Sequence, residues 1–192
     1  WLPEGPLGSW VLSHPAVLKI GDTLFVHGGI GPSYADWAID ELNQAVTDSL
    51  QNVDTVEGTI VRDEEGPLWY RGLALGDEER ETAHLEALLE NFGVKRIVLG
   101  HTVTQGVILP RFGGRVILAD VGLSSYYGDN QATLLIEGDA LTARHRRGDV
   151  KLPESTSDAA MQTYLARVSE LEPNNDAIKK RLGELREADA SE

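Results

Sequence analysis

Two histidines occupy matching places in the sequence, each at the end of an apolar run and beside glycine. His27 follows residues 24–26 and precedes two glycines, and His101 follows residues 97–100. Apolar runs of this length predict strands, and ligands gather where the strands of an α/β sheet end. Imidazoles carried by two strands to one rim can bind Zn, Mn or Fe. Both histidines are therefore candidate metal ligands, and the alternative is a hydrogen-bonded structural role for each.

Arg71 is a candidate phosphate-binding residue. Two large aromatic residues, Trp69 and Tyr70, come directly before it, and Gly72 follows it. Aromatic neighbours can support the stem and the planar head of an arginine, and a fixed guanidinium can hold two oxygens of a phosphate. The alternative, which applies to most arginines, is a solvated surface charge.

The other three histidines are predicted to have surface or structural roles. His14 precedes a proline in a turn, His84 lies in a charged helical pattern, and His145 stands among three arginines. None of these three histidines follows a predicted strand and adjoins a glycine, as His27 and His101 do.

Composition limits the possible partners of the chain. The 192 residues carry a formal net charge of -14, which argues against binding to duplex DNA or to an anionic membrane. There is no cysteine, so disulfides and thiolate sites are excluded, and no apolar run approaches the ~20 residues that span a bilayer. We expect a soluble protein of the cytoplasm, with the periplasm as the alternative. Because the sequence begins at Trp1 and its only methionine is Met161, we expect the later part of a longer protein.

The elements that must position these residues are short strands mixed with helices. Residues 16–20 and 24–27 predict a hairpin that turns at a Gly-Asp pair. Four further apolar runs predict strands; they cover residues 96–99, 115–118, 132–136 and 140–143. This order favours a layered α/β (α+β) sheet architecture over a helical bundle.

Two helices are predicted before residue 100. Ser33 and Asp36 have the spacing of a capping box, which predicts that the first helix begins there. The second is predicted over residues 77–92, with acidic residues at its N-terminal end and Gly93 as its stop. The acidic segment between the two helices, residues 52–67, is predicted to be a loop.

After Gly148 the strand-like apolar runs end, and a linker and helical patterns follow. This change predicts a main domain over residues 1–149 and a linker with a helical tail over residues 150–192. The tail carries two helical patterns divided at Pro173, and it faintly resembles one tetratricopeptide unit. A single unit cannot bury its own apolar face. The tail is therefore predicted to dock on the main domain as a helical hairpin, with neighbouring repeats beyond residue 192 as the alternative, and it is the expected site for a protein partner.

Four short motifs stand in the order and rough spacing of the calcineurin-like metallophosphoesterases. They are His27-Gly28-Gly29, Trp69-Tyr70-Arg71-Gly72, Gly100-His101-Thr102 and a segment that begins at Asp120 and ends with Tyr126-Tyr127-Gly128. Within that superfamily the chain is most similar to the bacterial serine/threonine phosphatases called Shewanella-like protein phosphatases. The resemblance covers about residues 10–147 and leaves out the helical tail.

This resemblance implies a fold and a set of site residues. The fold would be a metallophosphoesterase β-sandwich flanked by helices, of which residues 1–149 form the C-terminal part. His27 and His101 would ligate the second of two divalent metal ions, with Mn expected and Fe or Zn as alternatives. Arg71 would be the catalytic residue that binds the substrate phosphate, and Tyr126 and Tyr127 would line the substrate site.

Several motifs of the family are absent from the sequence. Its Asp-x-His, Gly-Asp-x-x-Asp-Arg-Gly and Gly-Asn-His-Asp/Glu motifs do not occur. In the family they supply the bridging carboxylate, the ligands of the first metal and the histidine that protonates the leaving group. The remaining metal ligands are therefore expected upstream of Trp1, and residues 1–192 alone are expected to have little or no activity.

The function that the resemblance implies is metal-dependent hydrolysis of phosphomonoesters by a hydroxide activated at a two-metal centre. Phosphoserine and phosphothreonine in proteins are the expected substrates, and the expected partner is a phosphorylated protein or a small phosphoester, with no nucleic acid and no membrane. One alternative is a symmetrical diadenosine tetraphosphatase or another metallophosphoesterase. The other is a non-catalytic binding module in which the tail is the working surface and the histidine pair is structural.

Overall fold

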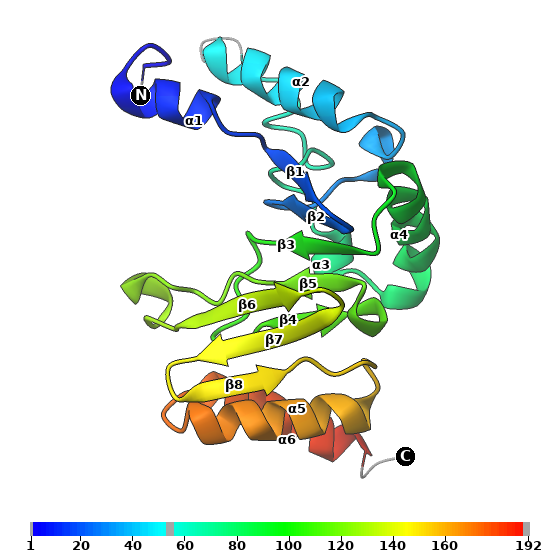
Figure 1. The fold of residues 1–192 in the computed structure, drawn as a ribbon, viewed down its shortest axis with the longest axis vertical. Helices are drawn as coiled ribbons and strands as arrows, with labels where there is room; N and C mark the ends of the chain where they lie inside the picture. The colour runs from blue at the N-terminus through cyan, green and yellow to red at the C-terminus, as the bar shows by residue number, and fades with distance from the viewer. Residues whose placement is uncertain (1, 53–55, 190–192) are drawn as a thin grey trace. The chain divides into compact units, whose positions relative to one another are not determined.

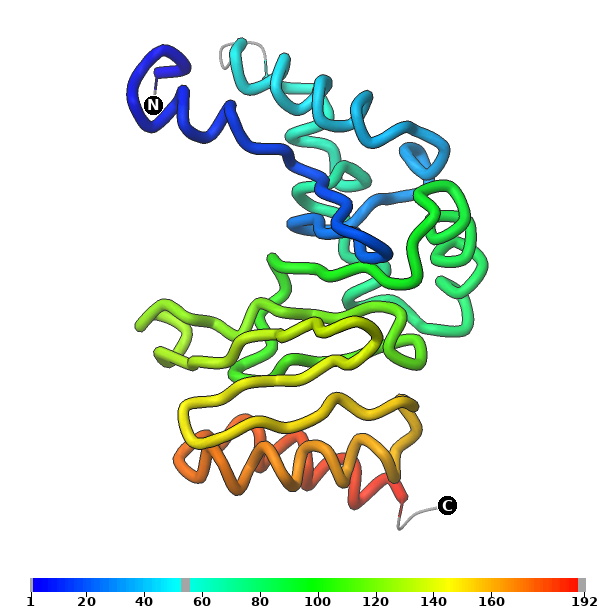
Figure 2. The backbone as a smooth tube through the Cα atoms, in the orientation of Figure 1, coloured from blue at the N-terminus to red at the C-terminus, as the bar shows by residue number. Residues whose placement is uncertain are grey.

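The computed structural model describes residues 2–52 and 56–189. Within these residues the chain forms six α-helices and eight short strands, as Figure 1 shows, and its path is traced in Figure 2. The predicted mixed α/β fold is confirmed. The chain divides into two compact units, residues 1–101 and 102–192, and the first contains both candidate histidines and Arg71. The predicted division at residue 150 was drawn between the part of the sequence that resembles the phosphatases and the helical tail. That division stays a prediction.

The sheet of the first unit is built on the predicted hairpin. Strands β1 (Val17–Ile20) and β2 (Thr23–Val26) pair in antiparallel fashion, and β2 pairs in parallel with β3 (Arg96–Leu99). The last residues of β2 and β3 lie opposite each other in this register. The chain therefore leaves both strands at the same end, with His27 following β2 and His101 following β3 by two residues.

The turn of this hairpin is tied to β3 as well as to its own strands. Gly21 takes a left-handed φ of 59°, which suits a glycine in a two-residue turn. The Asp22 carbonyl accepts a hydrogen bond from the Lys95 N–H at 2.8 Å. Its carboxylate pairs with Lys95 Nζ at 3.0 Å and with Nη1 of the buried Arg96 at 3.1 Å. These contacts fasten the start of β3 to the hairpin turn.

The first predicted helix begins later than its sequence indicates. Residues Pro32–Tyr34 form a single 3₁₀ turn, and helix α2 covers Ile39–Gln51. The predicted cap at Ser33 is wrong because the Ser33 N–H donates to the carboxylate of Glu65, 32 residues away, at 2.8 Å. Glu41 instead closes the true start of the helix, where its carboxylate accepts from the Ala38 N–H at 2.8 Å.

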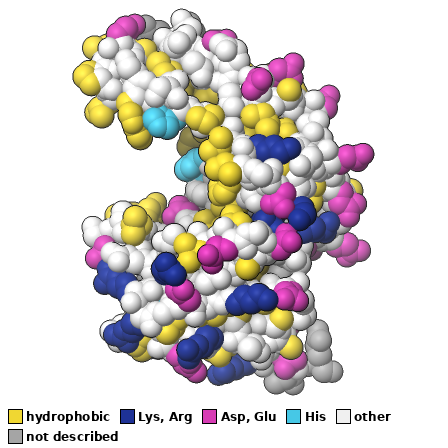
Figure 3. All heavy atoms as spheres, in the orientation of Figure 1, with side chains coloured by type: hydrophobic (Ala, Val, Ile, Leu, Met, Phe, Trp, Pro, Cys, Tyr) yellow, Lys and Arg dark blue, Asp and Glu magenta, His cyan; other side chains and the backbone are white. Residues whose placement is uncertain are grey.

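Helix α4 (Glu78–Phe92) follows its prediction closely. The Asp77 carboxylate accepts from the Arg80 N–H at 3.0 Å, and Gly93 ends the helix with a φ of 57°. Two short helices, α1 (Pro6–Leu12) and α3 (Gly72–Leu75), were not predicted. Helix α1 is one to two turns long and largely exposed, and hydrophobic side chains gather over this segment in Figure 3. The predicted loop after α2 is confirmed over residues 56–67, and residues 53–55 lie outside the described part of the chain.

The core of the first unit lies between its sheet and its helices. Its largest fully buried side chains come from β2, β3, the helices α2, α3 and α4, and the segment after β2; they are Leu24, Ile30, Leu42, Leu73, Leu85, Leu88, Ile97 and Leu99. Burial of this kind stabilises the two strands whose ends carry the candidate histidines.

The second unit contains two groups of antiparallel strands. Strand β4 (Leu109–Arg111) pairs with β5 (Val116–Leu118). Strands β6 (Ala132–Glu137), β7 (Ala140–His145) and β8 (Gly148–Lys151) form a three-stranded sheet. The predicted strands are confirmed, whereas β4 and β8 were missed. Neither strand is an apolar run, because β4 contains a proline and β8 contains polar residues.

The helical tail is a hairpin docked on the second unit. Helices α5 (Asp158–Leu171) and α6 (Asp176–Asp189) are divided near Pro173, as predicted. Helix α5 packs against β8, and the hydroxyl of the buried Tyr164 donates to the Ile108 carbonyl at 2.7 Å. Of the two interpretations of the tail, the structure therefore supports the docked hairpin.

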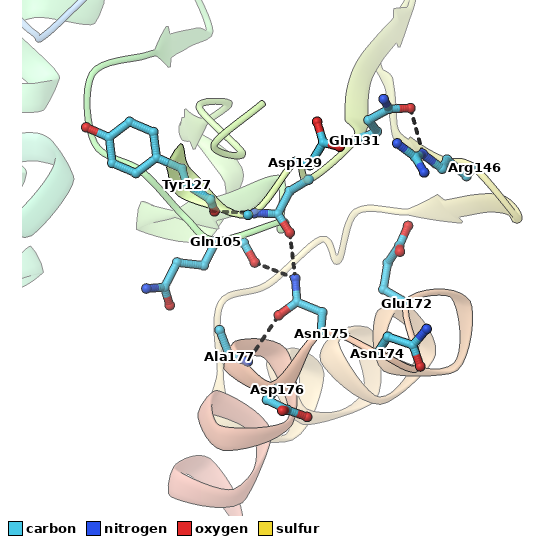
Figure 4. A pocket seen from close by; sticks show the side chains of 12 residues that line it. Gln105, Tyr127, Asp129, Gln131, Arg146, Glu172, Asn174, Asn175, Asp176 and Ala177 are labelled. Atoms are coloured by element: carbon cyan, nitrogen blue, oxygen red, sulfur yellow. Dashed lines mark hydrogen bonds between the residues drawn. The ribbon is translucent and has the colours of Figure 1, made fainter. Parts of the chain in front are cut away.

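Asn175 fastens the turn between these helices, as Figure 4 shows. Its side-chain nitrogen donates to the Gln105 carbonyl at 2.8 Å and to the side-chain oxygen of Asn130 at 2.9 Å. Its side-chain oxygen accepts from the first backbone N–H groups of α6. Among the described residues, no helix has the length and apolar character needed to cross a membrane.

Candidate metal and phosphate site

The parallel pairing of β2 and β3 brings the two candidate histidines together. His27 Nε2 lies 3.1 Å from His101 Nδ1, although the residues are 74 positions apart in the sequence. The two rings have centroids 4.8 Å apart and are tilted by 54°. The two nitrogens therefore lie side by side at the shared end of the two strands.

This separation fits two ligands of one metal ion. Imidazole nitrogens bind Zn²⁺ at about 2.0–2.1 Å. Two such bonds at an angle of roughly 100° place the nitrogens about 3.1–3.2 Å apart, and the observed distance is 3.1 Å. The described residues contain no group of three or more His, Cys, Asp or Glu side chains able to hold an ion. They thus offer two positions of a coordination shell, and the roles of His27 and His101 as ligands stay a prediction.

Arg71 joins the same cluster. Its Nη2 lies 2.7 Å from His101 Nε2, whereas His27 contacts the other ring nitrogen, Nδ1. Arg71 directly precedes helix α3 and its side chain is exposed. The structure therefore brings His27, His101 and Arg71 into one cluster. Phosphate binding by Arg71 stays a prediction.

The three side chains form one connected series of contacts. A guanidinium can only donate, so Arg71 is the donor in its hydrogen bond with His101 Nε2. The contact between His101 Nδ1 and His27 Nε2 extends the series, and the donor in that contact depends on the tautomers of the two rings. The series thus connects Arg71 through His101 to His27.

The loop that carries Arg71 is packed against the end of β2. The Gly28 N–H donates to the Pro67 carbonyl at 2.8 Å. A Cβ added at Gly28 would lie 2.7 to 2.8 Å from backbone atoms of Leu68 and Trp69. Glycine is required at this position because any side chain would push the loop away.

Trp69 supports His101 rather than Arg71. Its indole N–H donates to the Val61 carbonyl at 2.9 Å, and its ring meets the His101 ring edge to face, with centroids 5.2 Å apart. His101 itself takes a φ of 59°, a left-handed conformation that is uncommon outside glycine. Such a conformation persists only where neighbours hold it, and the Trp69 ring is one of those neighbours.

A second group of side chains connects this loop to α4. The Tyr70 hydroxyl donates to the Glu81 carboxylate at 2.7 Å, and burial together with this bond raises the pKa of Tyr70 above its usual value. The Tyr70 ring meets the His84 ring at 5.6 Å, and His84 Nε2 bonds to the Ile30 carbonyl at 2.7 Å. His84 thus has the structural role predicted for it. Sequence reasoning missed Glu81, and its spacing of three from His84 on one helix face was the available signal.

The remaining predicted site residues lie in the second unit. Tyr126 is 86% exposed and Tyr127 is 51% exposed, and their rings meet edge to face. The Asp120 carboxylate accepts from the Gly122 N–H at 3.0 Å, and the Asp120 carbonyl accepts from the Thr104 N–H at 2.8 Å. Substrate contact by the two tyrosines stays a prediction.

His14 and His145 also have structural surroundings. His14 Nδ1 bonds to the Trp10 carbonyl at 2.7 Å on the exposed helix α1. The His145 side chain is fully buried, with Nδ1 3.3 Å from a carboxylate oxygen of Glu172. Burial lowers the pKa of His145, and the nearby Glu172 opposes this effect.

Comparisons with known proteins identify relatives over most of the chain. No family model matches the sequence. An uncharacterized protein of Schizosaccharomyces pombe is 30% identical over 161 residues, which is 78% of this chain and 48% of that protein. Shewanella-like protein phosphatase 2 of Arabidopsis thaliana is 26% identical over 138 residues, which is 69% of this chain and 35% of that protein. The chain thus spans less than half the length of these relatives, which come from a yeast and a plant.

Solved structures of phosphatases share the fold. A cold-active protein-tyrosine phosphatase of a psychrophilic Shewanella species matches with a TM-score of 0.64 and 28% identity, over 76% of this chain and 45% of that one. A point mutant of a cold-active protein tyrosine phosphatase matches with a TM-score of 0.66 and 27% identity, over the same shares of the two chains. Sequence and structure therefore point to the same group of proteins. Over the 69% to 79% of its length that these alignments cover, the chain is a homologue of the Shewanella-like protein phosphatases, within the metallophosphoesterase superfamily.

Proposed function

We propose that this protein hydrolyses phosphomonoesters in phosphoproteins, with divalent metal ions held in part by His27 and His101. The observation that carries the proposal is the convergence of two imidazole nitrogens 3.1 Å apart and a guanidinium 2.7 Å from one of those rings. Metal ligands and a phosphate-binding cation are the two components that a metal-dependent phosphatase must place side by side.

The residues of this chain would have distinct tasks. His27 and His101 hold an ion through Nε2 and Nδ1, and Arg71 donates hydrogen bonds to the non-bridging oxygens of the phosphate. When bound, divalent ions activate water and neutralise charge on the phosphate. We propose Mn²⁺ as the native metal, with Fe and Zn as alternatives, and further ligands from a part of the protein outside these 192 residues.

The substrate class has two candidates within phosphoproteins. The sequence resemblance favours phosphoserine and phosphothreonine. The solved structures that match this chain are named as protein tyrosine phosphatases, which favours phosphotyrosine. Peptides that carry each phosphoamino acid, together with diadenosine tetraphosphate, separate these candidates from the dinucleotide-cleaving alternative when they are assayed with the protein at the length of its relatives.

The decisive variant is Arg71→Ala in that longer protein. Loss of one preorganised donor to the reacting phosphate lowers kcat by about 10²–10³, while metal content stays unchanged. Arg62→Ala is the matched control, since Arg62 is an exposed arginine of the same unit that pairs with Glu57. Near-normal turnover in Arg71→Ala contradicts the proposed role of this residue.

His27→Ala and His101→Ala test the ligand assignment separately. Each removes one of the two converging nitrogens and is expected to reduce the bound metal measured by elemental analysis. Unchanged metal content in either variant contradicts the assignment, and turnover without any bound metal contradicts the metal dependence.

A further inference from the structure

We propose that His145 and Glu172 form a pH-sensitive latch, which holds the α5–α6 hairpin on the second unit at neutral pH and loosens it on acidification. Both residues lie outside the candidate metal and phosphate site, so the latch does not depend on the proposed function. It makes the attachment of the helical tail sensitive to acid.

The pair lies where the end of α5 meets the three-stranded sheet. His145 is the last residue of β7, and Glu172 directly follows the last residue of α5. Gly148 of β8 is paired with His145, and a Cβ added at this glycine would lie 3.5 Å from the Leu171 side chain of α5. Separation of the hairpin from the sheet therefore takes Glu172 away from His145 and opens the imidazole to water.

The imidazole of His145 is enclosed and lacks hydrogen bonds. Its side chain is 0% exposed, and neither ring nitrogen has a hydrogen-bond partner among the described residues. Nδ1 lies 3.3 Å from Oε1 of Glu172, a buried atom that also makes no hydrogen bond within the described part of the chain. A charged ring in this place loses its hydration and gains one carboxylate in return, whereas a neutral ring loses much less. The docked hairpin therefore favours the neutral form of His145.

Two carboxylates favour the charged ring, and the surroundings weaken both of them. Glu172 lines the pocket shown in Figure 4 and its side chain is 27% exposed, so water screens its charge. Asp149 of β8 also acts on His145, but Arg144 donates a hydrogen bond to each of its carboxylate oxygens. Neither carboxylate therefore fully offsets the burial of a charge on the ring.

Other elements around the pair add positive or neutral groups, or a carboxylate in contact with solvent. Arg144 and Arg146 flank His145 in the sequence, and its paired residue on β6 is Ala132. On α6, the Asp176 side chain is exposed and pairs with a lysine of the same helix. Burial accordingly lowers the pKa of His145, and the two carboxylates oppose this effect without cancelling it.

Acid favours the undocked hairpin because His145 gains a proton more readily in water than in its buried place. A histidine with a lowered pKa in the folded state binds fewer protons there than it does when hydrated. Its full contribution to docking is present above the ordinary pKa of about 6.5 and is lost as the pH falls from that value towards the lowered pKa. Acidification therefore increases the population in which the hairpin is undocked.

Hydrogen exchange of the backbone amides in α5 and α6 measures this opening in the 192-residue chain. After correction for the intrinsic pH dependence of exchange, we expect the opening constant to rise roughly three- to eightfold between pH 7.0 and pH 5.5. About eightfold is the limit for one histidine that titrates near 6.5 when hydrated. His14→Gln is the control and should respond like the wild type, because His14 is an exposed histidine of the first unit. A wild-type opening constant that does not rise overturns the proposal.

Two variants of the pair should change this response in opposite ways. His145→Leu removes the titrating ring, so its opening constant should be the same at both pH values. Glu172→Gln keeps the ring and removes a carboxylate that opposes burial, so the increase from pH 7.0 to pH 5.0 should exceed that of the wild type. A wild-type response in His145→Leu, or a smaller increase in Glu172→Gln, overturns the proposal.

A titration of the histidine rings followed by nuclear magnetic resonance covers the case in which His145→Leu does not fold. The pKa of His145 should lie below 6.5 in the wild type and should fall further in Glu172→Gln. A wild-type pKa at or above 6.5, or a higher pKa in Glu172→Gln, overturns the proposal.

Discussion

At the scale of single residues, the side chains at the candidate site contact residues that are not next to them in the sequence. Trp69 and Tyr70 were expected to support Arg71, which they directly precede. In the structure the Trp69 ring packs against His101, and Tyr70 bonds to Glu81. The partner of Arg71 is His101 itself. Both residues follow a hydrogen-bonded turn, in which the Trp69 and Tyr70 N–H groups donate to the Gly66 carbonyl. Adjacent side chains in such a turn point in different directions, so their order in the sequence does not say what each one supports.

Trp69 is expected to stabilise the first unit through its indole N–H. Trp69→Phe removes the hydrogen bond to the Val61 carbonyl and keeps an aromatic ring beside His101. One such bond is worth about 1 kcal/mol, so the free energy of unfolding measured with urea should fall by about that amount. Trp10→Phe is the control, because Trp10 is 62% exposed on α1. Equal stability of the two variants would show that the Val61 contact is unimportant.

At the scale of secondary-structure elements, the parallel pair β2 and β3 creates the candidate site. Both strands are visible as local apolar runs, but their pairing is a long-range event stabilised by the ion pairs at Asp22 and by burial of side chains such as Leu24 and Leu99. A long-range contact also decides where α2 begins. The Glu65 carboxylate accepts the Ser33 N–H, which in the predicted capping box would have been donated to Asp36.

The Asp22 carboxylate gives this pairing a pH dependence. The hydrogen bond from Lys95, together with the charge of Arg96, lowers the pKa of Asp22 below its usual value. A carboxyl group with a lowered pKa in the folded state stabilises that state at neutral pH, and this contribution is lost as the pH falls through the lowered pKa. Asp22→Asn should therefore lower the melting temperature at pH 7, and the difference from wild type should shrink below about pH 4. A difference that is constant across this pH range would contradict the assignment.

Tyr164 is expected to anchor the helical hairpin. Its hydroxyl donates to the Ile108 carbonyl at 2.7 Å, and the Tyr164 residue is 3% exposed. Tyr164→Phe leaves this carbonyl without its partner, which should cost about 1–3 kcal/mol in the free energy of unfolding. Tyr126→Phe provides the comparison, because that hydroxyl belongs to an exposed residue. If both substitutions have the same small effect, the buried hydrogen bond does not hold α5 in place.

At the scale of the whole molecule, the chain carries only part of what the proposed reaction needs. Its net charge of -14 would repel a long polyanion, whereas a dinuclear metal centre would dominate the field close to the site. The chain also covers only 45% of the solved Shewanella phosphatase that it matches. The proposed function accordingly places further ligands outside these residues.

Residues 1–192 alone are expected to bind divalent metal weakly and to show little or no phosphatase turnover. At the candidate site two histidines meet, and the described residues contain no cluster of three His, Cys, Asp or Glu side chains that could hold an ion. Two neutral ligands without a carboxylate leave most of a coordination shell to water. Calorimetric titration with Mn²⁺ and an assay with p-nitrophenyl phosphate check both statements. Tight stoichiometric binding together with turnover would contradict them.

The sequence by itself was sufficient for the elements with strong local signals. These are the β1–β2 hairpin with its Gly-Asp turn, helix α4 with Asp77 and Gly93 at its ends, and the two tail helices around Pro173. It also identified His27, His101 and Arg71 as candidates, because a polar residue that follows an apolar strand or adjoins glycine is recognisable without any knowledge of its partners.

Only the tertiary structure decided which of these residues meet. His27 and His101 are 74 positions apart, and Arg71 is 30 positions from His101. Such contacts depend on strand pairing and on the packing of many side chains together, and no local pattern contains that information. The late start of α2 and the contact of Trp69 with His101 belong to the same class, because in both cases a partner far away in the sequence outweighs or replaces the local preference. Strands β4 and β8 differ, because each pairs with a strand next to it in the sequence and was missed for lack of an apolar run.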